Sequence, residues 1–198
     1  KQLIAKINDK AALQNTYISN DGDWIRFETI VSTTPDQTAI SSGYLEREWE
    51  ENGRKYFHYK MDCKILNFAA WLSAKYEKIE DNWNGIDLAV YYHKGHEYNI
   101  QDMMNAMKKS LEYYTANFSP YQFRQLRIFE FPRFSSFAQA FPNMIPFSES
   151  IGFIAKLDEK NVNYPFWVTA HEVAHQWWAH QVIGANVEGA TVTSEILA

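Results

Sequence analysis

Two histidines and a glutamate near the end of the chain have the spacing of a metal-binding motif. His171 and His175 are four positions apart, and Glu172 follows the first of them directly. Residues four apart on an α-helix share one face, about one turn from each other, so both imidazoles can reach one metal ion from the same side. Glu172 would stand beside the metal without being a ligand, where a carboxylate can hold a water and take its proton. The pattern predicts a catalytic Zn²⁺ centre.

The residues around this motif predict the helix that it needs. Pro165 suits a first helical position, with Asn163 or Tyr164 as the cap. No Gly or Pro follows until Gly184, so we expect the helix to continue toward that residue. The alternative is an aromatic core helix whose histidines have no metal. Burying two histidines and an acid in that way would be costly.

Catalytic zinc sites use three protein ligands and keep one position for water, so a third ligand is expected downstream. Two acids follow the motif, Glu188 and Glu195. The polar run that begins at Thr191 suggests a helix start with Thr191 as the cap, which would place Glu195 on a rigid first turn. Glu188 lies among small residues and glycines that are typical of an exposed turn. Glu195 is the preferred third ligand, and Glu188 is the alternative.

The run HEVAHQWW, with a glutamate about twenty residues later, resembles the M1 (gluzincin) family of zinc aminopeptidases. In that family eighteen residues separate HExxH from the glutamate, whereas nineteen lie between His175 and Glu195 here. The additional residue fits in the Gly-containing loop. The resemblance implies that His171, His175 and Glu195 bind the metal, that Glu172 is the general base, and that the activity is removal of N-terminal residues from peptides.

A second part of the resemblance concerns Glu149, which stands 22 positions before His171. In the M1 family a Gly-Ala-Met-Glu-Asn strand precedes HExxH at about this distance, and its Glu binds the free α-amine of the substrate. The segment 146–152 is similar to it only in the Glu and in the Gly that follows. A carboxylate close to the metal would neutralise an ammonium and select chain ends. Glu149 is therefore expected to bind substrate, and the alternative is an ordinary exposed strand residue.

The first part of the chain predicts antiparallel β structure. The stretch 24–32 alternates apolar and polar residues. Asn52-Gly53, flanked by two alternating runs, predicts a hairpin. A turn-rich stretch at 81–85 marks the expected boundary, so residues 1–80 are expected to form a β-rich domain.

Beyond the boundary the pattern is that of mixed strands and helices. Strands are predicted over 86–92 and 125–131, and an amphipathic helix over 99–117 presents a Met stripe that should lie in the core. Two prolines next to a short apolar run indicate an edge strand, because Pro cannot donate to a ladder. The resemblance implies that residues 81–198 are the N-terminal half of a thermolysin-like zincin domain. The expected fold class is therefore α+β, in a piece of a longer protein.

Single polar residues elsewhere have simpler interpretations. His93 and His96 flank Gly95 and are expected in a surface turn rather than at a metal. Cys63 is the only cysteine, so an internal disulfide is excluded, and it is expected to pack in a core because no catalytic motif surrounds it.

Composition limits the partners. The formal net charge is −5 and no basic patch points to nucleic acid. No apolar run approaches the roughly eighteen residues that span a bilayer. The stretch 171–190 is also similar to M1-type domains fused to ABC-transporter permeases of bacteria. That likeness implies an extracytoplasmic domain whose polypeptide includes a membrane-spanning remainder.

Two functions follow from these observations. The first is zinc-dependent hydrolysis of a peptide substrate, which the intact Glu172 favours. The second is a degenerate peptidase-like module that binds or senses peptides for a transporter, which the altered surroundings of Glu149 and the long spacing favour. Because Glu195 lies close to the end of these residues, where helices fray, we expect the piece alone to have a weak or incomplete metal site.

Overall fold

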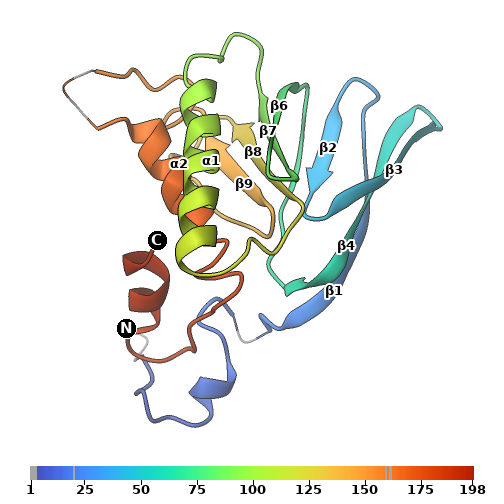
Figure 1. Cartoon of the computed structure of the whole chain (residues 1–198). Coiled ribbons are helices and arrows are strands. Elements are labelled where there is room, and N and C mark those ends of the chain that lie inside the picture. The colour runs from blue at the N-terminus through green and yellow to red at the C-terminus, as the bar shows by residue number, and fades with distance from the viewer. Residues whose placement is uncertain (1–3, 20, 159, 161) are drawn as a thin grey trace.

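The computed structural model describes residues 4–19, 21–158, 160 and 162–198. They form a mixed α/β structure in which helices cover one face of the larger sheet (Figure 1). In chain order the elements are η1 (Ala12–Gln14), β1 (Trp24–Thr33), β2 (Thr38–Ser41), β3 (Tyr44–Glu51), β4 (Arg54–Leu66), β5 (Trp71–Ala74), β6 (Glu77–Trp83), β7 (Ile86–Tyr92), α1 (Ile100–Asn117), β8 (Gln125–Phe131), β9 (Met144–Ser148), α2 (Tyr164–Ala174) and η2 (Val192–Ile196).

The first part of the chain forms two small antiparallel sheets. One has the strand order β1-β4-β3, and the other pairs β2 with β5. The predicted hairpin is confirmed, because β3 and β4 meet at Asn52-Gly53, whose φ angles are 50° and 71°. A tight two-residue turn requires left-handed backbone at both positions, and Asn-Gly adopts it at low cost. Cys63 is exposed rather than in a core, because it lies at an irregularity of β4 opposite the register shift between Arg26 and Glu28.

The second part forms one four-stranded sheet with the order β6-β7-β8-β9. β6 is antiparallel to β7, whereas β7, β8 and β9 are parallel, and α1 forms the crossover between β7 and β8. β6 begins at Glu77 and a turn at Asn84-Gly85 joins it to β7. The turn-rich stretch at 81–85 therefore lies within a hairpin of this sheet. The expected edge strand is β9, which contains Pro146.

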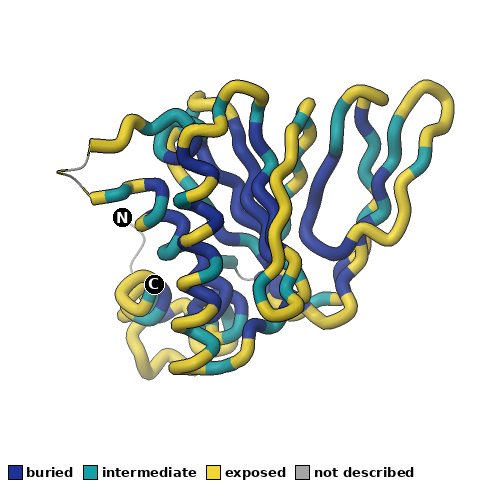
Figure 2. Tube along the Cα trace, turned by 45° about the horizontal axis from the view of Figure 1, so that its top comes forward, coloured by how far each residue is buried: buried dark blue, intermediate teal, exposed yellow. Residues whose placement is uncertain are grey.

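The main hydrophobic core lies between this sheet and the two helices. α1 buries Met103, Met107 and Leu111 completely, so the predicted Met stripe does pack in the core. Ile128 and Phe147 reach the same core from β8 and β9. The buried segments run through the central strands and along the inner sides of the helices (Figure 2). The opposite face of the sheet packs toward β2 and β5.

The helix that carries the motif begins as predicted and ends earlier. The side chain of Asn163 accepts a hydrogen bond from the Phe166 N–H at 3.1 Å, and Pro165 lies in the first turn. The expected continuation toward Gly184 is wrong, because α2 ends at Ala174. Burial of the following tryptophans overrides helix propensity there, and the indole N–H of Trp177 donates to the Ser119 carbonyl at 3.0 Å.

The last element is the short helix η2, which carries Glu195 as expected. Thr191 is its N-cap residue as expected, but its side chain makes no capping hydrogen bond. Within the described part of the chain, every helix is too short or too polar to cross a bilayer.

Candidate metal centre

Three side chains from two separate segments converge on one point. His171 lies in the last turn of α2, His175 caps that helix, and Glu195 comes from η2. The two Nε2 atoms of the histidines are 3.2 Å apart. Oε2 of Glu195 is 3.6 Å from Nε2 of His171 and 3.7 Å from Nε2 of His175. The structure therefore brings together the three residues that the sequence predicted as metal ligands.

These separations fit a tetrahedral cation. Zinc bound at about 2.0 to 2.1 Å by nitrogen and oxygen places neighbouring ligand atoms about 3.3 Å apart. The three observed distances, from 3.2 to 3.7 Å, are close to that value. Two imidazoles and one carboxylate are also a donor set that catalytic zinc sites use, with a fourth position left for water. The residues present thus fit a zinc ion in both geometry and chemistry.

The surroundings of the histidines hold them in the form that binds a metal. Nδ1 of His175 lies 3.1 Å from the Trp178 carbonyl, which can only accept a hydrogen bond. Nδ1 is therefore the donor, which in the neutral ring leaves the lone pair on Nε2. Burial lowers the pKa of His171, and the neighbouring His175 lowers it further, so the neutral ring is favoured. The indole of Trp167 stacks on the His171 ring with centroids 6.0 Å apart.

The carboxyl group of Glu172 lies beside these ligands and is buried. Burial raises its pKa to about 7, although a hydrogen bond from the Ala140 backbone acts in the opposite direction. Its Oε2 has no hydrogen-bond partner among the residues that the structure describes. An orphaned buried oxygen is costly unless a ligand or water completes it. With a pKa near neutrality, this carboxyl group can both accept and return a proton.

A small pocket of about 180 Å³ opens beside the ligands. His175 and Glu195 line it together with Tyr17, Ile18, Phe68, Gln139, Ala140, Ala179 and His180. Nε2 of His180 donates to the Ala140 carbonyl at 3.1 Å, and burial lowers the pKa of this ring to about 4. Sequence reasoning missed Gln139 and His180. Gln139 lies in an irregular segment without periodicity, whereas the position of His180, five residues after His175, was a visible signal.

Glu149 does not join this group. Its carboxylate lies near Arg133, with 3.5 Å between Oε1 and Nε, and 4.0 Å from Nδ1 of His96. His96 in turn hydrogen-bonds to the fully buried Glu130, which also accepts the His93 N–H at 2.5 Å. The expected surface turn is present, since the His96 N–H donates to the His93 carbonyl at 3.0 Å, but the His96 ring is directed at Glu130. A glutamate inside an apolar strand was the missed signal, because a buried carboxylate needs partners.

Two clusters of histidine and glutamate side chains are therefore present in the described part of the chain, and they are built differently. In the first, the ligand atoms face one another at distances suited to a shared cation. In the second, formed by His96, Glu130 and Glu149, the ligand atoms also lie within 4.8 Å of one another, but Arg133 already pairs with Glu149. Glu188, the alternative third ligand, is also engaged elsewhere, in an ion pair with Lys6 at 3.0 Å.

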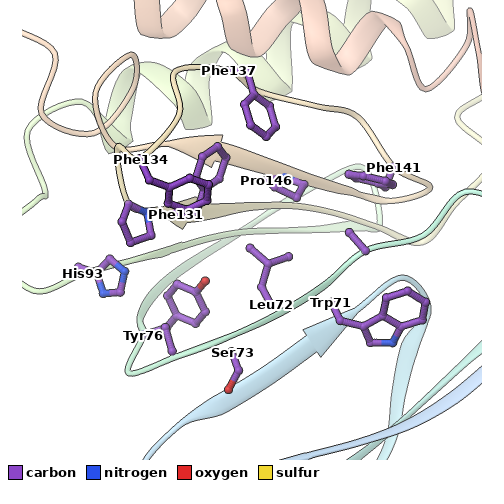
Figure 3. Close-up of a pocket in the computed structure, with 13 residues that line it drawn as sticks. Trp71, Leu72, Ser73, Tyr76, His93, Phe131, Phe134, Phe137, Phe141 and Pro146 are labelled. Atoms are coloured by element: carbon purple, nitrogen blue, oxygen red, sulfur yellow. The ribbon is translucent and has the colours of Figure 1, made fainter.

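A larger pocket of about 430 Å³ lies on the other face of the sheet. Phe131 and Pro146 face it, whereas their strand neighbours Glu130 and Phe147 point to the helix side, as the alternation of a strand requires. Its wall is mainly aromatic (Figure 3). It contains no carboxylate and none of the metal-binding candidates. This apolar pocket is therefore separate from the metal centre.

Comparison with known proteins points to peptidases. No family model matches the chain. It is 27% identical over 162 residues to a leucyl aminopeptidase of Saccharolobus solfataricus and 25% identical over 163 residues to the probable aminopeptidase 1 of that organism. It is 26% identical over 162 residues to the probable aminopeptidase 2 of Sulfurisphaera tokodaii. Each match covers 79% of this chain but only 20% of the relative, so the chain spans about a fifth of their length. These distant similarities support a peptidase-like relationship.

Proposed function

We propose that this chain carries the metal-binding part of a zinc-dependent aminopeptidase of the M1 (gluzincin) type. One observation carries the proposal: His171, His175 and Glu195 offer ligand atoms 3.2 to 3.7 Å apart, and the buried Glu172 that follows His171 has a carboxyl oxygen without a partner among the described residues. The fold proposed with it is the N-terminal half of a thermolysin-like domain. Removal of N-terminal residues is supported by the names of the relatives rather than by the site itself.

The mechanism assigns one task to each group. His171, His175 and Glu195 would hold the zinc ion, and the hydrogen bond from His175 Nδ1 to Trp178 keeps that ring oriented. When bound, zinc would supply Lewis acidity, polarising the scissile carbonyl and acidifying a water. Glu172 takes a proton from the attacking water and transfers it to the leaving amine.

The substrate would approach through the pocket beside Gln139 and Ala140. The Ala140 backbone connects the wall of this pocket to Glu172. It hydrogen-bonds to the Glu172 carboxyl group, and its carbonyl accepts a hydrogen bond from His180. The amine-binding role predicted for Glu149 stays a prediction, and its carboxylate lies 3.5 Å from Nε of Arg133 and 4.0 Å from Nδ1 of His96.

The test is Glu172→Gln in the full-length protein. Zinc content measured by mass spectrometry should stay at the wild-type level, because Glu172 is not a ligand. Turnover of leucyl p-nitroanilide should fall by at least about 100-fold, the usual contribution of a general base. Glu112→Gln, at an exposed position of α1, is the matched control and should keep both properties. A wild-type rate in Glu172→Gln, or a wild-type protein that binds no zinc, would refute the proposal.

A further inference from the structure

We propose that the N-terminal segment Ala5–Ile18, here called the strap, fixes the loop that carries the third metal ligand and closes one side of the metal pocket. The loop, Gly184–Ala190, connects the turn after His175 to η2 and thus to Glu195. The proposal rests on the proposed function, because it assigns the strap a role at the same metal centre.

The first end of the strap is bonded to Glu188. The Glu188 N–H donates to the Ala5 carbonyl at 2.8 Å. Its carboxylate accepts from Nζ of Lys6 at 3.0 Å and from the Ile7 N–H at 3.4 Å. Three interactions from consecutive strap residues therefore meet on one residue of the loop. Glu188, the alternative third ligand predicted from the sequence, is therefore an anchor for the strap.

The second end of the strap is bonded to the beginning of the loop. The Tyr17 N–H donates to the Gly184 carbonyl at 3.0 Å, and the Asn186 N–H donates to the Asn15 carbonyl at 2.9 Å. Between these two bonds, Thr16 and Ala185 form an antiparallel bridge. The loop is thus held near both of its ends by main-chain hydrogen bonds. Figure 1 shows the blue N-terminal segment next to the red segment that leads to η2.

The strap also reaches the metal pocket. Tyr17 and Ile18 line it on one side, together with the ligands His175 and Glu195. Tyr17 therefore has two contacts: its backbone N–H anchors the loop, and the residue forms part of the pocket wall. A substrate that enters the pocket would meet the strap.

Hydrophobic burial contributes little to holding the strap. No strap residue belongs to the hydrophobic core clusters of the described chain, and Ile7 and Leu13 are 66% and 43% exposed. Its attachment rests mainly on backbone bonds and one exposed ion pair. Such a segment opens locally at low cost, without unfolding the core. When it opens, the loop loses its hydrogen bonds to the strap. Positioning Glu195 at the metal then costs more conformational entropy, because the loop has to be ordered first.

The first experiment uses amide hydrogen exchange in the metal-free full-length protein. Tyr17→Pro removes the donor to the Gly184 carbonyl, and Tyr17→Ala is the control that removes the side chain but keeps the N–H. The amides of Asn186 and Glu188 should exchange at least about tenfold faster in the Pro variant than in the Ala variant, as expected from local opening. Amides of α1 should not change, which shows that the core remains folded.

The second experiment measures zinc affinity by competition with a fluorescent chelator. Deletion of residues 1–19 should weaken binding by about tenfold or more, through the entropy of an unanchored loop. Lys6→Ala should weaken it by about twofold, in keeping with an exposed ion pair. Lys10→Ala is the matched control, since Lys10 is an exposed strap lysine without an ion pair among the described residues. It should bind zinc like the wild type.

The outcomes separate this inference from the proposed function. Unchanged exchange in Tyr17→Pro, or faster exchange with unchanged zinc affinity in the variants, would overturn the role of the strap while leaving the metal centre intact. A wild-type protein that binds no zinc, with the same result in His175→Ala, would instead refute the metal centre and this inference with it. If the deleted chain fails to fold, the comparison of Tyr17→Pro with Tyr17→Ala decides by both measurements.

Discussion

The residues of the candidate centre show what local spacing can predict. His171, Glu172 and His175 lie within five positions, so one helical turn determines their geometry. Glu195 was correctly expected to lie near them because few acids follow the motif. The neighbours His180 and Gln139 were missed, because their proximity depends on a turn and an irregular segment. Tertiary packing, rather than local propensity, decides those positions.

His180 predicts how stability changes with pH. Burial lowers its pKa from 6.5 to about 4, so the unfolded chain binds the proton more readily than the folded one. The stabilising contribution is present above pH 6.5 and is lost as the pH falls toward 4, by about 3 kcal/mol in total. Urea unfolding should show that the wild type loses stability relative to His180→Phe when the pH falls from 7 to 4.5, because only the wild type has the buried imidazole. Parallel profiles would contradict this prediction.

Glu149 gives a second prediction at the same scale. If it bound the substrate amine, Glu149→Gln would raise KM for leucyl p-nitroanilide at least about 100-fold, the value of a lost buried charge pair. Because its carboxylate pairs with Arg133 and His96 instead, KM should stay within about threefold of the wild type. Steady-state kinetics of this variant distinguishes the two, and a large rise in KM would restore the amine-binding role.

Among the elements, α2 illustrates which signals were reliable. Its beginning was predictable, because an Asn cap and a Pro in the first turn act through local hydrogen bonds and a fixed φ angle. Its end at Ala174 was not, because the sequence after it contains no Gly or Pro before Gly184. The chain turns there so that Trp177 and Trp178 can enter the core. Nothing in the local sequence distinguishes a buried tryptophan that ends a helix from one that continues it.

The cap of α2 can be tested directly. Asn163→Ala removes the acceptor for the Phe166 N–H and a hydrogen bond to Asp102, and should lower the free energy of unfolding by about 1 to 2 kcal/mol. Asn163→Ser keeps a capping oxygen and should recover about half of that loss. Chemical denaturation monitored by circular dichroism gives both values. Equal stability of Asn163→Ala and the wild type would show that the cap is unimportant.

At the scale of the whole molecule, one buried cation joins the two parts. Arg127 on β8 donates to the Ser41 and Gly43 carbonyls at 2.9 and 3.1 Å, and to the side chain of Asn143 at 2.8 Å. It thereby connects the four-stranded sheet to the segment between β2 and β3. The sequence predicted strands in both parts, but this contact spans more than 80 positions and has no local signal. The division at residue 80 stays a prediction.

Removing that cation should therefore affect the whole fold. Arg127→Met leaves the Ser41 carbonyl without its side-chain donor, whereas the Gly43 carbonyl keeps Gln125, and the loss of these hydrogen bonds should cost about 1 to 3 kcal/mol. Arg133→Met, at an exposed arginine, is the control and should cost less than about 1 kcal/mol. Urea unfolding followed by tryptophan fluorescence measures both. A loss below about 1 kcal/mol in Arg127→Met would show that the two parts do not depend on this contact.

The strap gives the chain an order of events during synthesis. Lys6 is synthesised 182 residues before its partner Glu188. Contacts of such sequence separation form late in folding, because a long loop must close first. Nascent chains should therefore assemble both sheets before the metal pocket is complete, and metal capture would be one of the last steps on the way to the mature protein.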